Sequence, residues 1–111
     1  MVSLFDQGDI VYVQFDPSVG HEAQKRRPAI VVSTRAFNLR SCMTVVCPIT
    51  SADNHYPLHV PLPGGLAING FVCVEQLKAL DLEARRAELV DRADAETMAD
   101  ILDIAGAIFG I

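Results

Sequence analysis

The chain has 111 residues and a formal net charge of −5, with 50% hydrophobic and 21% charged residues. This composition is typical of one compact globular domain and excludes a disordered or repeat protein, so we predict a single domain over residues 1–111. The longest apolar runs have the length of strands and no secretory signal is visible, which favours a cytoplasmic protein.

Most of the chain has the two-residue period of β-strands. Residues 8–15 alternate, with Val11, Val13 and Phe15 on one face, and predict a first strand that is followed by a loop as far as Arg27. A single helical turn is expected at 36–39. Further strands are predicted at 29–33, 44–49, 55–62, 71–75, 77–80 and 88–90.

The last element has a helical period. Apolar residues recur every three or four positions from Met98 to Phe109, and Asp94 and Glu96 suit the positive end of a helix dipole. We therefore predict an amphipathic helix that begins close to Asp94, whose apolar stripe is either core or a dimer face. Many short strands followed by one helix indicate an α+β fold with a small, strongly bent antiparallel sheet.

The cysteines and histidines give no metal motif. Cys47 and Cys73 are expected in the core, and no two cysteines have zinc-ribbon spacing. His55 and His59 have helical spacing, but Pro57 between them favours a strand and argues against a metal pair. We predict no metal and no other cofactor.

A basic segment interrupts the acidic chain. Residues 21–40 hold five basic residues and one acidic residue. Pro28 restrains the backbone of Arg27, so the direction of this guanidinium should be well defined, and its planar fork matches a phosphate. Alternatively, Arg27 forms only an exposed ion pair with Glu22 or Asp16, worth about 0 to 1 kcal/mol.

An ordered set of short motifs covers nearly the whole chain and resembles one known family, the MazF/PemK (Kid) toxins. The motifs are Gly8-Asp9-Ile10-Val11, Phe15-Asp16-Pro17, Gly20-His21-Glu22, Arg27-Pro28-Ala29-Ile30-Val31-Val32, Phe37-Asn38, Pro48-Ile49-Thr50-Ser51, Tyr56-Pro57 and Glu75-Gln76-Leu77. The resemblance implies an SH3-like barrel and a homodimer. It also implies a metal-independent, sequence-specific endoribonuclease that is the toxin of a type II toxin–antitoxin pair, with a MazE-like antitoxin as partner.

The resemblance also implies roles for individual residues. The phosphate-contacting arginine of the family falls on Arg27 and its hydroxyl residue on Thr50. Either His21 or Glu22 would transfer protons, and the sequence does not rank the two. Glu75 matches an acidic position, but Cys73 stands where some members have an arginine. The residues expected to contact RNA are Lys25, Arg26, Ser51, Glu75, Gln76, Arg85 and Arg86. Taken alone, Thr50 is typical of a turn and residues 81–86 of a solvated surface.

The expected chemistry requires little from the protein. If the ribose 2′-hydroxyl of single-stranded RNA attacks the neighbouring phosphorus, the protein has only to stabilise the phosphoryl oxygens and transfer protons. The products would be a 2′,3′-cyclic phosphate, or a 3′-phosphate after opening, and a 5′-hydroxyl. The alternative is a non-catalytic inhibitor like the CcdB toxins, which bind DNA gyrase, because fold alone does not decide function.

Overall fold

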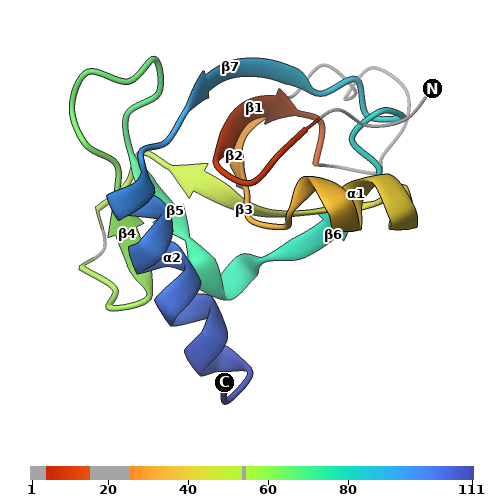
Figure 1. Ribbon diagram of the computed structural model, residues 1–111. Coiled ribbons are helices and arrows are strands. Elements are labelled where there is room, and N and C mark those ends of the chain that lie inside the picture. Colours follow the sequence, from red (N-terminus) through yellow and green to blue (C-terminus); the bar gives the residue numbers. More distant parts are fainter. Residues whose placement is uncertain (1–4, 16–25, 54) are drawn as a thin grey trace.

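The computed structural model describes residues 5–15, 26–53 and 55–111, which form a bent antiparallel sheet with helices on its outside (Figure 1). The strand order is β4-β5-β3-β2-β1-β7, and β6 pairs with β3 beside this path. The strands are β1 (Asp9–Val13), β2 (Arg27–Val31), β3 (Thr44–Thr50), β4 (His59–Pro61), β5 (Phe71–Cys73), β6 (Lys78–Leu80) and β7 (Glu88–Arg92).

The predicted α+β fold is confirmed. Every strand pair in the described residues is antiparallel, and the sheet curls as in a small barrel. The sheet is open rather than closed, because its end strands β4 and β7 are not paired with each other within the described residues.

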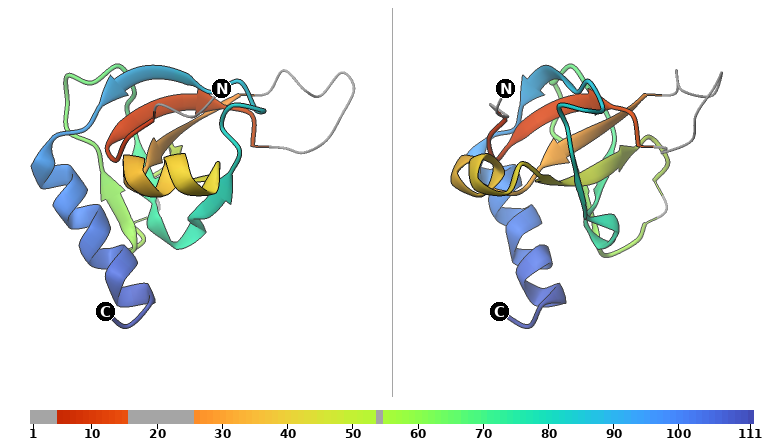
Figure 2. Two further views of the ribbon diagram at one scale, coloured as in Figure 1. Left: turned by 45° about the vertical axis from the view of Figure 1, so that its right-hand side comes forward. Right: turned by 90° about the vertical axis from the view of Figure 1, so that its right-hand side faces the viewer.

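The helices lie where the sequence predicts them. Helix α1 (Arg35–Ser41) begins after Thr34, whose hydroxyl accepts a hydrogen bond from the Phe37 amide, and Cys42 ends it. Helix α2 (Ala95–Ile108) follows Asp94, which confirms the predicted start. It descends from the end of β7 and leaves the C-terminus well away from the sheet (Figure 2). No helix in the described ranges is long and apolar enough to cross a membrane.

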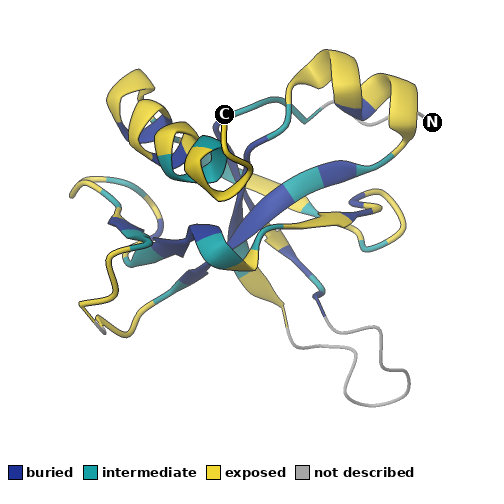
Figure 3. Cartoon of the chain, turned by 90° about the horizontal axis from the view of Figure 1, so that it is seen from below, coloured by how far each residue is buried: buried dark blue, intermediate teal, exposed yellow. Residues whose placement is uncertain are grey.

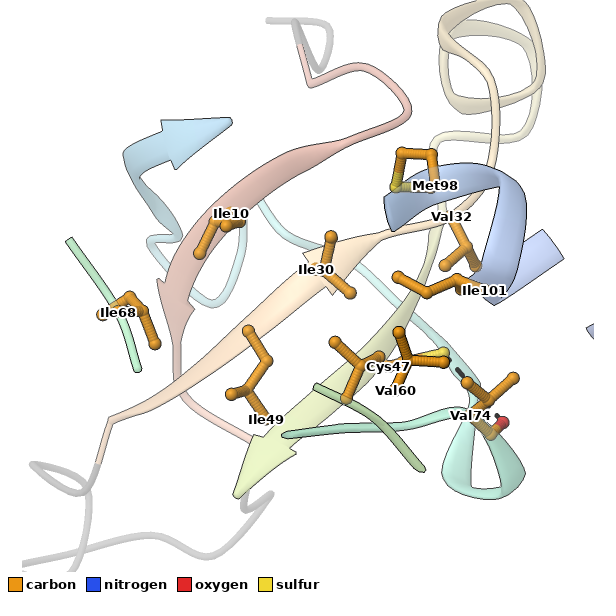
Figure 4. Close-up of a cluster of buried hydrophobic side chains, with 11 residues drawn as sticks. Ile10, Ile30, Val32, Cys47, Ile49, Val60, Ile68, Val74, Met98 and Ile101 are labelled. Carbon is orange, nitrogen blue, oxygen red and sulfur yellow. Dashed lines mark hydrogen bonds between the residues drawn. The ribbon is translucent and has the colours of Figure 1, made fainter. Parts of the chain in front are cut away.

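Strand alternation divides the core into two clusters, because neighbouring strand residues point to opposite faces. Ile10, Ile30 and Cys47 belong to the cluster that Met98 and Ile101 of α2 cover (Figure 4). The next residues along the strands, such as Val11 and Val31, belong to the second cluster. Coloured by burial, α2 has dark buried residues toward the sheet and exposed residues on its outer side (Figure 3).

Two predicted strands are shorter than expected. The strand predicted at 55–62 is reduced to His59–Pro61, because His55 has a left-handed φ of 52° and Pro57 offers no amide hydrogen. The strand predicted at 71–75 ends at Cys73, and a short 3₁₀ helix, η2 (Val74–Gln76), follows it. Glu75 therefore lies in a turn and not in a strand.

Candidate active site

A pocket of about 480 Å³ opens at the ends of β2 and β3. It brings together four residues that the sequence singles out, Arg27, Thr50, Ser51 and Gln76, and adds His59 and Cys73. Three of the four, Arg27, Ser51 and Gln76, are solvent-exposed, and Thr50 is half-buried. A pocket with exposed polar side chains at its mouth can admit a strand-shaped polar ligand.

The pairing of β2 with β3 explains why Arg27 and Thr50 lie in one pocket. Ala29 is paired with Pro48, and the same register continued by two residues sets Arg27 opposite Thr50. Arg27 is the first residue of β2, where the sequence analysis placed the end of a loop. Among the described residues, no carboxylate or carbonyl is paired with its guanidinium, while Asp16 and Glu22, the partners considered for an exposed ion pair, lie outside them.

Thr50 is held from two sides. Its Oγ1 accepts a hydrogen bond of 3.2 Å from the Ala52 amide, which confirms the expected turn and leaves the hydroxyl proton available to donate. On the other side Gly70, with φ 142°, lies so close that a Cβ there would collide with the carbonyl oxygen of Thr50. The glycine therefore permits the main-chain contact that fixes Thr50.

A partly buried histidine and carboxylate lie beside these residues. His59 Nε2 lies 3.1 Å from Glu75 Oε2, and the side chains are 8% and 23% exposed. His59 is directly paired with Cys73 across β4 and β5, so the two side chains share one face of the sheet. Sequence reasoning missed His59 as a site residue, and the signal that would have found it is the pairing of these two short strands.

Both buried thiols are held in the protonated form. Burial raises the pKa of the Cys47 thiol to about 12. Burial and then the charge of Glu75 raise the pKa of the Cys73 thiol above its ordinary value. The expectation that both cysteines are core residues is confirmed, although Cys73 also lines the pocket.

Arg26, Arg85 and Arg86 do not line the pocket. Arg26 Nη2 donates to the carbonyls of Tyr12 and Arg86, and its Nη1 lies 3.5 Å from Glu88 Oε1. Arg85 Nη1 donates to the carbonyls of Gln14 and Phe15, both at 2.8 Å.

These bonds hold the turn between β6 and β7 against the end of β1. RNA contacts by Arg26, Arg85 and Arg86 stay a prediction. His21, Glu22 and Lys25 lie outside the described residues.

Residues 6–109 match the family described as PemK-like, MazF-like toxin of type II toxin–antitoxin system, and the chain belongs to this family. It is 41% identical over 108 residues to the endoribonuclease toxin ChpB of Escherichia coli K12, covering 90% of each chain. It is 36% identical over 89 residues to the endoribonuclease toxin MazF of the same strain, covering 78% of this chain and 79% of MazF.

Solved structures agree with the fold. The crystal structure of MazF (Form-I) from Deinococcus radiodurans matches with a TM-score of 0.85 at 36% identity, covering 100% of this chain and 99% of MazF. A MazE–MazF complex (Form-II) from the same organism also matches with a TM-score of 0.85, at 32% identity, covering 100% of this chain and 98% of that chain. The resemblance read from the sequence motifs is thus confirmed.

Proposed function

We propose that this toxin is a sequence-specific endoribonuclease that cleaves single-stranded RNA without a metal ion. The 2′-oxygen attacks the adjacent phosphorus, the bond from phosphorus to the 5′-oxygen breaks, and a 2′,3′-cyclic phosphate and a 5′-hydroxyl result. The names of its relatives, endoribonucleases of 41% and 36% identity, support this activity.

One observation supports the proposal most strongly: the arginine Arg27 and the hydroxyl residue Thr50 line one pocket from adjacent strands. Arg27 supplies paired N–H donors and a permanent charge to the nonbridging phosphoryl oxygens, which gain negative charge as the 2′-oxygen attacks. Thr50 donates one further hydrogen bond to the same group. The ribose is its own nucleophile, so no activated side-chain nucleophile is needed.

Two proton transfers complete the reaction. One proton leaves the 2′-hydroxyl and another reaches the departing 5′-oxygen, so a base and an acid must stand on either side of the phosphate. Within the described residues, the His59–Glu75 pair is the group at the pocket able to accept and return a proton. His21 or Glu22, expected from the family resemblance, would supply the second position.

Substitution of Arg27 tests the phosphate contact. Arg27→Ala should lower RNA cleavage by at least about a hundredfold, the loss typical of removing one transition-state donor. Thr50→Val should lower it by about tenfold or more, the worth of a hydrogen bond to a charged group. Both variants should unfold within about 0.5 kcal/mol of the parent, because neither change removes packing from the core. Arg40→Ala, an exposed arginine in α1, is the matched control.

The reaction type is tested on the substrate. A long RNA incubated with the protein in excess EDTA should be cut at one short motif, with a cyclic phosphate or 3′-phosphate and a 5′-hydroxyl at the new ends. A short RNA oligonucleotide that contains this motif should be cut as well, and the same oligonucleotide with a single 2′-deoxy sugar at the cut site should stay intact. Intact RNA together with gyrase inhibition would instead support the CcdB-like alternative.

The assembly follows from the same family. Structures of relatives include complexes of MazF with MazE. We propose that this chain acts as a homodimer in the cytoplasm, where its RNA substrate is found. A MazE-like antitoxin would neutralise it by laying an acidic, partly disordered segment over Arg27.

A further inference from the structure

Three side chains with metal-binding atoms meet beside the pocket, two of which, His59 and Cys73, line it. One ligand atom from each of His59, Cys73 and Glu75 lies within 4.8 Å of the other two. Cross-strand pairing holds His59 beside Cys73, and Glu75 follows two residues later in η2. The imidazole and carboxylate are already 3.1 Å apart. Ligand atoms around tetrahedral zinc are separated by about 3.5 Å, so the three side chains would have to shift only slightly to reach that geometry.

The hydrogen bond between His59 and Glu75 leaves two polar atoms of this cluster without a partner. His59 Nδ1 and Glu75 Oε1 are buried and have no hydrogen-bond partner within the described part of the chain. A buried polar atom without a partner destabilises the folded state. A cation between the three side chains would engage the second carboxylate oxygen of Glu75 and so give Oε1 a partner.

The donor types select the ion. One thiolate, one imidazole and one carboxylate suit Zn²⁺, whereas Mg²⁺ and Ca²⁺ prefer oxygen ligands alone. Zinc displaces the thiol proton when it binds, so a protonated cysteine is no obstacle to a site of this kind. Three protein ligands would leave the fourth position of a tetrahedral ion open.

We propose that His59, Cys73 and Glu75 form an inhibitory Zn²⁺ site. The bound ion occupies the imidazole and carboxylate that transfer protons, and RNA cleavage stops until the metal is removed. Inhibition rests on the proposed ribonuclease function, whereas metal binding does not. Cys73 is the one of the three that the proposed proton transfers do not use, so its replacement tests metal binding with the proton-transfer pair left in place.

Cobalt reports on the site directly. The purified chain is stripped of metal with a chelator and titrated with Co²⁺, whose thiolate ligand gives a near-ultraviolet charge-transfer band. The parent and Cys42→Ala, which removes the exposed thiol, should both show this band and lose it when Zn²⁺ is added. Cys73→Ala should show no such band.

Cleavage assays then connect the metal to activity, each variant being compared with its own metal-free rate. Added Zn²⁺ should stop cleavage by the parent and by Cys42→Ala, and EDTA should restore it. Cys73→Ala should require at least about tenfold more Zn²⁺ for the same fractional inhibition, since even outer partners of metal ligands are worth 10- to 100-fold in affinity. If Cys73→Ala does not fold, Glu75→Gln replaces it in the cobalt titration and should bind Co²⁺ more weakly.

Two results would overturn the site: the absence of a thiolate band in the parent, or inhibition of Cys73→Ala at the parent's zinc concentration. Cysteine-dependent cobalt binding by a protein that leaves RNA intact would keep the metal site and reject the ribonuclease. RNA cleavage by a protein with no cysteine-dependent cobalt band would keep the ribonuclease function and reject the metal site.

Discussion

Cys42 ends helix α1 in a left-handed conformation, with φ 60°, and its amide donates to the carbonyl of Asn38. This backbone geometry closes a helix well, but a residue with a Cβ adopts it at a cost of about 1 kcal/mol or more. Glycine is free of that cost. The thiol itself is exposed and contributes no core packing.

We therefore expect Cys42→Gly to raise the free energy of unfolding by about 1 kcal/mol, measured by urea denaturation. Cys42→Ala keeps the Cβ and removes the thiol, so it should leave the stability unchanged. An equal gain in both variants would mean that the sulfur, and not the backbone conformation, is unfavourable there.

The sequence identifies some residues of the candidate site and misses others. Arg27 and Thr50 are found by the family resemblance, and the pairing of β2 with β3 then explains why they meet. The His59–Glu75 pair is not found, because its members are 16 residues apart and meet only through the pairing of β4 with β5. A pattern of alternating residues does not show which strands become neighbours.

Among the secondary-structure elements, strand β3 determines the shape of the site, because it pairs with β5 near its end and with β6 near its start. The chain must turn a corner between those two partners, and η2 is that corner. Val72, Cys73 and Val74 are all buried, and this unbroken apolar run predicts a longer strand than β5.

Gly70 is where β5 approaches Thr50 most closely, and its replacement should affect both stability and activity. Gly70→Ala should cost about 1 to 3 kcal/mol of unfolding free energy through overpacking and should lower RNA cleavage, because Thr50 is displaced. Thermal unfolding and initial cleavage rates measure the two effects.

Gly65→Ala is the matched control, since Gly65 also has a positive φ, 93°, but nothing lies within 4 Å of its Cβ position. It should lose some stability through backbone strain and keep full cleavage activity. If Gly70→Ala also keeps full activity, the contact with Gly70 does not position Thr50.

Most basic side chains in the described residues contact other groups of the same chain. Arg92 Nε lies 2.9 Å from Asp9 Oδ1, and Lys78 Nζ lies 5.1 Å from the centre of the Phe15 ring. Arg26 and Arg85 are bonded to main-chain carbonyls. An overall charge of −5 is thus compatible with RNA binding only if a few local cations, Arg27 first among them, meet the phosphates.

Because Arg26 and Arg85 donate hydrogen bonds to main-chain carbonyls, we expect RNA binding to depend only weakly on ionic strength. Each neutralised phosphate of a single strand contributes about −0.7 to the slope of log affinity against log salt concentration, so a slope shallower than about −2 is expected. Arg27→Ala should reduce that slope by about 0.7, and Arg26→Ala should leave it unchanged. A smaller slope in Arg26→Ala would mean that this arginine releases counterions from RNA after all. With few counterions released, this toxin would hold its substrate over a wide range of cellular salt, and its selectivity would depend on base contacts more than on charge.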